Sequence, residues 1–167
     1  MQILKKGHSG VAVIDPKKRA GEPGQYVKWG ADDPDLALVL SAARSAGCEI
    51  RYYFNDVKTI AGEVIPLKIV VTEIPPGHVQ PFHIHETVHE VSVVNEGTIT
   101  EIESDVLEES DVAVLKKAGT KLSAGDTVVD EPEKRHTIAN FTRKYAKFTT
   151  TQSARMAREK FSSDWKR

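Results

Sequence analysis

The sequence predicts one all-β domain, a sandwich or barrel of short strands with helical additions at its ends. Most of the chain after Gly47 divides into short segments that alternate apolar and polar residues or are rich in β-branched ones. Turn signals that contain glycine separate several of these segments, as they do in β-sandwiches and barrels. The length of 167 residues suits a single domain.

Residues 1–44 are predicted to form an N-terminal arm followed by a helix. The arm is rich in glycine, proline and charge, so we expect it to be irregular with at most short strands. The helix should follow because Asp33 can cap it, Pro34 suits its first turn and Gly47 can end it. Its apolar stripe consists of Leu36, Val39, Leu40 and Ala43.

Residues 45–151 are predicted to form the β-domain itself. The expected strands, in chain order, are residues 49–54, 67–74, 88–94, 98–103, 112–116, 127–129, 137–140 and 146–151. Asn95, Glu96 and Gly97 fit a three-residue hairpin loop in which the glycine takes the left-handed conformation. The acidic stretch 101–111 is interpreted as a solvated loop or hairpin edge.

The two ends of the chain bear on assembly. Residues 152–167 are predicted to form a C-terminal helix, because Ala154, Ala157, Phe161 and Trp165 recur at helical spacing. An irregular arm and an amphipathic helix are a large addition to a small barrel, and their apolar stripes must be buried. We expect a homodimer, which is the commonest solution. The alternative is that both elements fold back onto their own barrel.

The charge balance and the single cysteine exclude several functions. Lys and Arg number 23 against 24 Asp and Glu, and a net charge of −1 offers no electrostatic basis for nucleic acid as the main partner. No apolar run is long enough to span a membrane, and the N-terminus lacks the apolar region of a signal peptide. Cys48 has no partner for an intrachain disulfide, so we expect a cytoplasmic protein in which it is a core residue.

A pair of histidines is the strongest chemical signal. In an extended segment, alternation places His83 and His85 on one face. Two imidazoles suit a divalent metal, and a nearby carboxylate such as Glu90 would offset its charge. His136 could complete the set from another strand. A His-x-His pair taken alone is more often two ordinary surface or core histidines, so the pattern by itself leaves both interpretations open.

Residues 77–97 and 125–140 resemble the two sequence motifs of the cupin superfamily. The first segment matches the first motif in full, with Gly77, His83, His85, Glu90 and Gly97 at the family's spacing. The second segment matches in Gly125, His136 and Asn140. It departs from the family at residues 131–133. There the family usually has Pro-x-Gly and this chain has Glu-Pro-Glu, so the turn before the last histidine is expected to be built differently.

This resemblance implies a small single-domain cupin, a jelly-roll β-barrel that binds a metal. The implied ligands are His83, His85, Glu90 and His136. They would hold one divalent transition metal, with iron favoured and manganese, zinc, nickel or copper as alternatives. The motif glycines and Asn140 would be structural.

Several further residues near the implied site have open roles. Glu86 follows the His-x-His pair and is the candidate catalytic base, although a solvated loop carboxylate is the commoner role for such a residue. His89 should point away from the ligands by alternation. Arg51, Tyr53 and Lys68 lie on strand faces that could look into the barrel, where a cation would bind a carboxylate substrate. Lysine and arginine usually stay outside, so we expect these faces to be external.

The resemblance leaves three functions open, because cupins include oxygenases, decarboxylases, isomerases, lyases and non-catalytic binding proteins. We favour a metal-dependent enzyme that acts on a small organic molecule, most of all a mononuclear-metal oxygenase of the dioxygenase type. The second function is a non-redox isomerase, lyase or decarboxylase in which the metal acts as a Lewis acid. The third is a non-catalytic small-ligand-binding cupin, against which the complete ligand set argues.

Overall fold

Two antiparallel sheets and two helices form the part of the chain that the computed structural model describes, residues 3–4, 6–55, 57–65 and 67–153. The strands are β1 (Val11–Ile14), β2 (Tyr26–Trp29), β3 (Glu49–Phe54), β4 (Leu67–Ile74), β5 (Glu90–Glu96), β6 (Thr98–Glu103), β7 (Thr120–Ser123), β8 (Thr127–Asp130), β9 (His136–Ala139) and β10 (Ala146–Ser153). The helices are α1 (Leu36–Ala46) and α2 (Val112–Ala118). The larger sheet has the order β2-β1-β3-β4-β10-β5-β8, and the smaller has the order β7-β6-β9.

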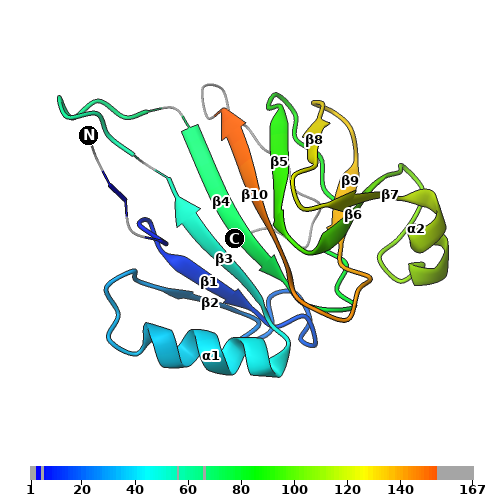
Figure 1. Ribbon diagram of the computed structural model, residues 1–167, viewed down its shortest axis with the longest axis horizontal. Coiled ribbons are helices and arrows are strands. Elements are labelled where there is room, and N and C mark those ends of the chain that lie inside the picture. The colour runs from blue at the N-terminus through cyan, green and yellow to red at the C-terminus, as the bar shows by residue number, and fades with distance from the viewer. Residues whose placement is uncertain (1–2, 5, 56, 66, 154–167) are drawn as a thin grey trace.

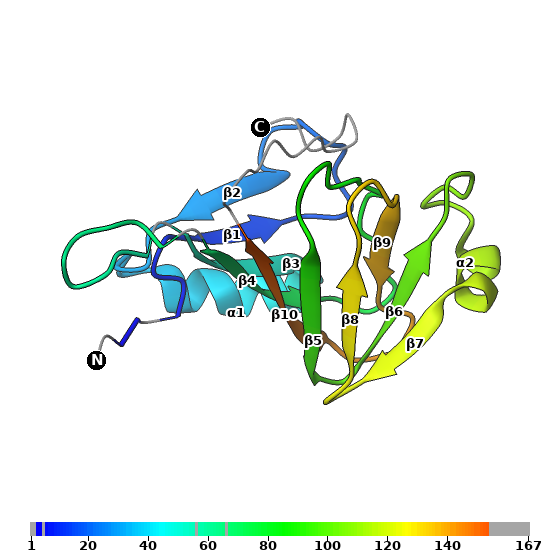
Figure 2. The same ribbon diagram turned by 90° about the horizontal axis from the view of Figure 1, so that it is seen from above.

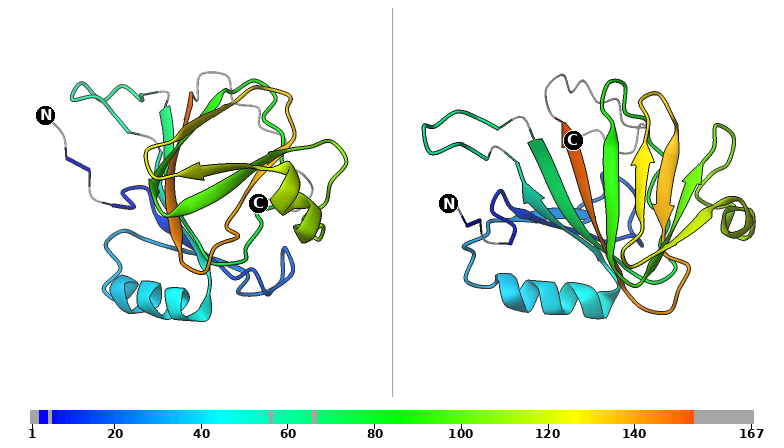
Figure 3. Two further views of the ribbon diagram at one scale, coloured as in Figure 1. Left: turned by 45° about the vertical axis from the view of Figure 1, so that its right-hand side comes forward. Right: turned by 45° about the horizontal axis from the view of Figure 1, so that its top comes forward.

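The larger sheet curls, and the smaller sheet comes to face part of it (Figure 1, Figure 2). In the left view of Figure 3, β6 and β7 cross in front of β4 and β10. The two sheets remain separate, so the barrel is open. Apolar side chains from both sheets fill one end of it, and this core consists of Ile74, Val94, Ile99, Ile138, Ala146 and Phe148.

Helix α1 covers the larger sheet on its outer face, beside β1 and β3 (Figure 1). Leu36, Leu40 and Ala43, which belong to the predicted stripe, pack against Ile50 and Tyr52 of β3. The stripe therefore packs on the chain's own sheet, with Ala43 buried and Leu36 and Leu40 partly buried. Since side chains alternate along a strand, Arg51 and Tyr53 on β3 face the opposite side, the inside of the barrel.

Most predicted elements are confirmed. Strands β3, β4 and β6 have the predicted bounds, and β5, β8, β9 and β10 differ from prediction by at most two residues at either end. Gly97 joins β5 to β6 with φ of 76°, and a Cβ atom there would lie 3.2 Å from Ala146. Helix α1 begins at Leu36, and its N-cap is Asp35 rather than the predicted Asp33, so Pro34 lies before the first turn. Gly47 ends the helix in the left-handed conformation, as predicted. The arm also supplies β1 and β2, which extend the larger sheet beside β3.

Residues 112–116 form part of helix α2, so the prediction of a strand there is wrong. Valine favours strands, but the one buried residue of this segment is Leu115. It packs on Phe82, Ile102 and Ala139. One buried residue per turn is enough for a short surface helix, and Lys116 and Lys117 suit its C-terminal end. Neither helix of the described chain has the length and apolar character needed to cross a membrane.

Two further predictions need correction. Glu101, placed in a solvated acidic stretch, is a buried residue of β6, because that strand continues to Glu103 and is paired on both sides. Residues 152 and 153, assigned to the C-terminal helix, continue β10 by pairing with β4. The remainder of that predicted helix, residues 154–167, lies outside the described residues.

Candidate metal centre

Four polar side chains from three segments of the chain meet inside the barrel: His83, His85, Glu90 and His136. The two closely spaced histidines lie on the extended segment before β5. The backbone of His83 exchanges two hydrogen bonds of 3.0 Å with that of His136, at the start of β9. Glu90 begins β5. Potential ligand atoms of all four residues lie within 4.8 Å of one another, so the fold brings together the group that the resemblance implied.

Backbone carbonyl groups determine the tautomer of two imidazoles. The Nδ1 atom of His83 lies 3.1 Å from the carbonyl oxygen of Pro81, and that of His136 lies 3.0 Å from that of Lys134. Because a carbonyl oxygen only accepts, Nδ1 donates in both neutral rings and Nε2 keeps its lone pair. In the described part of the chain, Nε2 of His136 is buried and has no hydrogen-bond partner. A metal ion would supply the partner that this nitrogen lacks.

Glu90 provides the anionic ligand atom. Its Oε2 lies 2.9 Å from Nε2 of His85 and accepts a hydrogen bond from Nε2 of Gln152. Burial opposes ionisation of this carboxyl group, but the adjacent His85 lowers its pKa to about 2. Burial, together with His136, lowers the pKa of His83 to about 3. At neutral pH the group therefore contains an ionised carboxylate and a neutral imidazole, which are the metal-binding forms.

This donor set fits a divalent first-row transition metal. Adjacent ligand atoms at about 2.1 Å from one ion lie roughly 3 Å apart. The 2.9 Å between His85 and Glu90 agrees with that spacing. Cys48 lies in the core beneath α1, so these donors are imidazole nitrogen and carboxylate oxygen without thiolate. Such ligands suit iron, manganese, zinc, nickel and copper alike, and the site could hold any of them.

Comparison with known proteins identifies the fold. No family model and no curated protein sequence matches the chain. A solved structure from Klebsiella pneumoniae, an uncharacterized conserved protein with a double-stranded β-helix domain, is 18% identical with a TM-score of 0.52. The similarity covers 68% of this chain and 79% of that one. The chain has a cupin-type fold.

Two named cupins are among the other similar structures. A sugar phosphate isomerase of the cupin superfamily from Silicibacter pomeroyi is 17% identical, with a TM-score of 0.48 over 63% of this chain. The match spans 59% of that protein, which is less than two thirds of its length. A Cupin 2 conserved barrel domain protein from Salinispora arenicola is 18% identical, with a TM-score of 0.47 over 61% of this chain and 72% of its own.

The turn before His136 keeps a left-handed residue although it lacks the glycine of the cupin motif. Glu133 occupies the glycine position with φ of 64°, and it is the one non-glycine residue with positive φ in the described chain. Its amide donates a 2.7 Å hydrogen bond to the carbonyl oxygen of His85, which ties this turn to the ligand segment. A left-handed glutamate costs about 1 kcal/mol. The departure from the motif therefore adds strain but leaves His136 beside the other three side chains.

The ligand group opens into a pocket of about 190 Å³. The pocket is lined by Tyr26, Arg51, Tyr53, Lys68, Val70, Thr72, Gln80, His83, His85, Glu90, Ile138, Phe148, Thr150 and Gln152. Arg51, Tyr53 and Lys68 therefore face the barrel interior, and the expectation that their strand faces are external is wrong. Arg51 can face inward because it forms an ion pair with the buried carboxylate of Glu49, which offsets the cost of burying a guanidinium.

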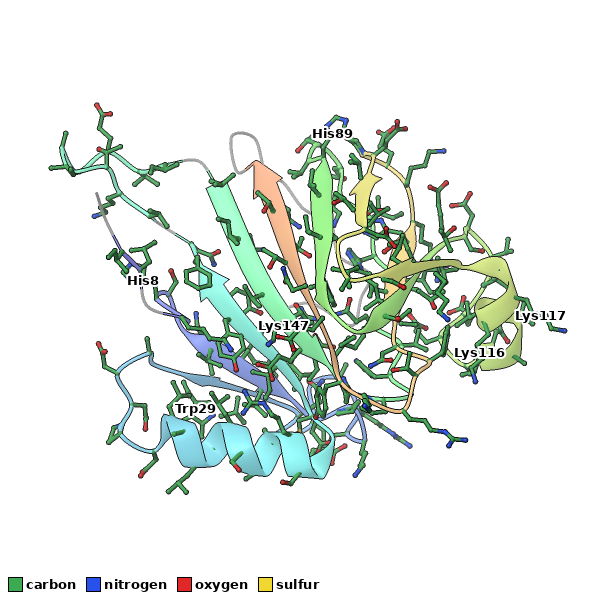
Figure 4. All side chains as sticks on the ribbon, viewed as in Figure 1. His8, Trp29, His89, Lys116, Lys117 and Lys147 are labelled. Atoms are coloured by element: carbon green, nitrogen blue, oxygen red, sulfur yellow. The ribbon has the colours of Figure 1, made fainter. Side chains whose placement is uncertain are left out.

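Two other residues singled out in the sequence lie outside this pocket lining. His89 is exposed near the start of β5 (Figure 4), as alternation predicts. Glu86 is half-buried on the loop between the histidine pair and β5. The structure does not place its carboxylate among the potential ligands or in the pocket wall, and its role as a catalytic base stays a prediction.

Sequence reasoning missed two buried carboxyl groups behind His136. Oδ2 of Asp130 lies 4.0 Å from Nε2 of His136, and a carboxylate oxygen of Glu101 lies within 4.8 Å of both residues. Among the described residues, neither oxygen of Glu101 has a hydrogen-bond partner, nor has Oδ2 of Asp130. Burial, and then the charge of Asp130, raises the pKa of Glu101. The sequence did contain one signal of this burial. Glu101 lies two residues after Ile99, a residue of the core, so the two side chains share a face of the strand.

Proposed function

We propose that this protein is a mononuclear metal-dependent enzyme that acts on a small organic molecule. The observation that carries the proposal is the position of the ligand group at the wall of a pocket. Three of its members, His83, His85 and Glu90, line that pocket. A structural metal site is usually closed by protein ligands, whereas a catalytic one keeps a position open to a second molecule.

We propose an oxygenase of the dioxygenase type as the reaction class, with iron as the metal. A bound divalent metal would supply redox chemistry and Lewis acidity to the molecules beside it. Three imidazoles and one carboxylate would leave two positions of a six-coordinate ion, which supports a reaction between two small molecules. The apolar side chains of Val70, Ile138 and Phe148 would exclude water from part of the pocket.

A non-redox isomerase, lyase or decarboxylase is the second candidate, and the two cations in the pocket favour it. Arg51 and Lys68 line the same cavity as the ligand group. Fixed positive charge in a partly desolvated site stabilises negative charge that develops on a substrate. A metal held by the ligand group and acting as a Lewis acid would also stabilise that negative charge.

Metal content and oxygen dependence separate these candidates. We expect protein purified from its native host to contain one iron per chain, and to turn over a member of a small-molecule library in air but not under anaerobic conditions. Equal turnover without oxygen, retained after replacement of iron by manganese or zinc, would instead assign the non-redox class. Full activity in metal-free wild-type protein would contradict both.

We further propose that the protein is a cytoplasmic homodimer whose other partner is its small-molecule substrate. The exposed side chains of Leu38 on α1 and Val27 on β2 lie on accessory elements that a second copy could cover. Light scattering at micromolar concentration tests the assembly. A single species of 18.4 kDa would contradict the dimer.

A further inference from the structure

One wall of the pocket carries cations in line with the metal ligands. Lys68 on β4 pairs with Gln152 on β10, and Gln152 pairs in turn with Glu90 on β5. These residues therefore form one row across the inner face of the larger sheet. Neighbouring strands lie about 4.8 Å apart, so the backbone of Lys68 lies about 10 Å from that of Glu90. A compact molecule can contact both ends of the row.

Arg51 adds a second cation to that wall, and it is held in place from behind. The guanidinium Nε donates to the carboxylate of Glu49, which is 1% exposed. Nε2 of Gln80 donates to the same carboxylate at 3.0 Å, and Nε2 of His78 lies 2.9 Å from it. Burial opposes ionisation of Glu49, but Arg51 and His78 lower its pKa to about 2. The contact with Glu49 engages Nε, and the planar guanidinium is the cation best suited to bind a carboxylate or a phosphate.

The charge of the pocket favours an anionic occupant. Among its lining residues, Arg51 and Lys68 are the cations and Glu90 is the one carboxylate. Glu90 belongs to the ligand group, so a divalent ion there would more than balance it. The carboxylate of Glu49 balances the charge of Arg51. Arg51 and Lys68 therefore place two cationic donors in the same space as the ligand group, and a cationic donor binds an ionised acceptor more strongly than a neutral one.

We propose that the substrate of this site is a compact organic acid, whose carboxylate or phosphate is bound by Arg51 and Lys68 while its opposite end reaches the metal ligands. The proposal rests on the function proposed above and names its substrate class. A pocket of about 190 Å³ limits the size of that acid.

Calorimetric titration of metal-loaded protein with matched anionic and neutral probes tests the proposal. The carboxylate arm uses malonate, succinate and glutarate against their diamides, and the phosphate arm uses glycerol 3-phosphate against glycerol. We expect at least one anion to bind about tenfold or more tightly than its neutral counterpart, because a hydrogen bond to a charged group contributes about 1.5–3 kcal/mol. The arm that binds identifies which acid group the wall accepts.

Variants of the two cations localise the effect. Lys68→Gln should lower the affinity for the anion about tenfold. Arg51→Lys keeps the ion pair with Glu49 but loses the planar fork, so it should also weaken the anion by about tenfold while the protein stays folded. Lys117→Gln, on the exposed surface of α2 (Figure 4), is the control of equal charge change and should bind as the wild type does.

The outcomes distinguish this proposal from the one on which it rests. Elemental analysis after each titration reports whether the metal is retained. A wild-type protein that holds no metal would contradict the proposed function. Retained metal with no anion bound, equal binding of anion and neutral probe, or anion affinity unchanged in both Lys68→Gln and Arg51→Lys would overturn the substrate class and leave the metal site standing.

Discussion

Glu73 and Glu101 are both carboxyl groups buried on strands, but their surroundings are opposite. Glu73 faces α1 on the outside of the larger sheet. It accepts hydrogen bonds from Arg44 at 2.7 and 3.1 Å and from the Tyr52 hydroxyl at 2.9 Å. Glu101 faces the barrel interior beside Asp130 and His136, where no described residue donates a hydrogen bond to either of its oxygens.

The pKa values of the two groups move in opposite directions for this reason. Burial would raise both, but Arg44 and Tyr52 lower that of Glu73 to about 2. Burial and the charge of Asp130 raise that of Glu101. Proteins generally satisfy buried polar groups where only the fold is at stake, and exceptions cluster at functional sites. The outer face therefore holds a buried carboxylate with hydrogen-bond donors, and the inner face holds one without donors among the described residues.

The largest effect that this contrast predicts is on metal binding. His83→Ala should remove stoichiometric metal, because loss of one imidazole leaves an incomplete ligand group, whereas Glu73→Gln should retain it. Elemental analysis of purified protein measures both. His89→Ala is the matched control, since His89 is exposed outside the ligand group. Full metal content in His83→Ala, or its loss in His89→Ala, would show that the ligand assignment is wrong.

The next effect is on stability at the outer face. Glu73→Gln should lower the free energy of unfolding at pH 7 by about 2 kcal/mol, less than a fully buried ion pair because Arg44 is partly exposed. The folded-state pKa of Glu73 is lowered, so its contribution exists above the usual pKa of a glutamate and fades as pH falls toward 2.

Urea denaturation at several pH values measures this change. The difference between wild type and Glu73→Gln should shrink as the solution becomes acidic. Lys147→Gln breaks the surface pair of Lys147 with Glu96, which is 69% exposed, and should change stability by less than about 0.5 kcal/mol. A Glu73→Gln effect that is as small, or that does not depend on pH, would remove the contrast between the two faces.

At the inner face, removal of the buried carboxyl group should raise the free energy of unfolding instead of lowering it. Glu101→Gln should raise the free energy of unfolding of the metal-free protein at pH 7 by about 1 kcal/mol, because it removes the cost of a buried charge without donors. The folded-state pKa of Glu101 is raised, so the wild type loses stability as pH rises through it, and the gain should vanish in acid. Metal content should be unchanged; its loss would make Glu101 a ligand.

The smallest effect concerns the turn that links the two ligand segments. Glu133→Gly should stabilise the protein by less than about 1 kcal/mol, because glycine adopts positive φ without strain but gains entropy in the unfolded chain. Thermal unfolding measures the change. Glu131→Gly, at a position without positive φ, should not stabilise; equal gains in both variants would show that the left-handed backbone is not the cause.

Much of the fold and the ligand group could be predicted from local patterns. The bounds of β3, β4 and β6 follow from alternation and β-branched residues, and Gly47 and Gly97 stop their elements because each has positive φ. The spacing in residues 77–97 identified the ligand candidates by resemblance. Two backbone hydrogen bonds between His83 and His136 bring the second motif to the first.

Only the tertiary structure decided which strand faces look inward. Alternation shows that Arg51 and Tyr53 share a face of β3. Neither face of β3 is open to solvent, because α1 covers one and the other lines the interior pocket. When both faces are covered, the contrast between apolar and polar positions no longer identifies the inside. The same limit applies to Glu101, whose neighbours come from β8 and β9. The sequence by itself thus determined most of the strands and the metal-ligand candidates. The curl of the sheet decided which charges join them, because only chain packing brings distant faces together.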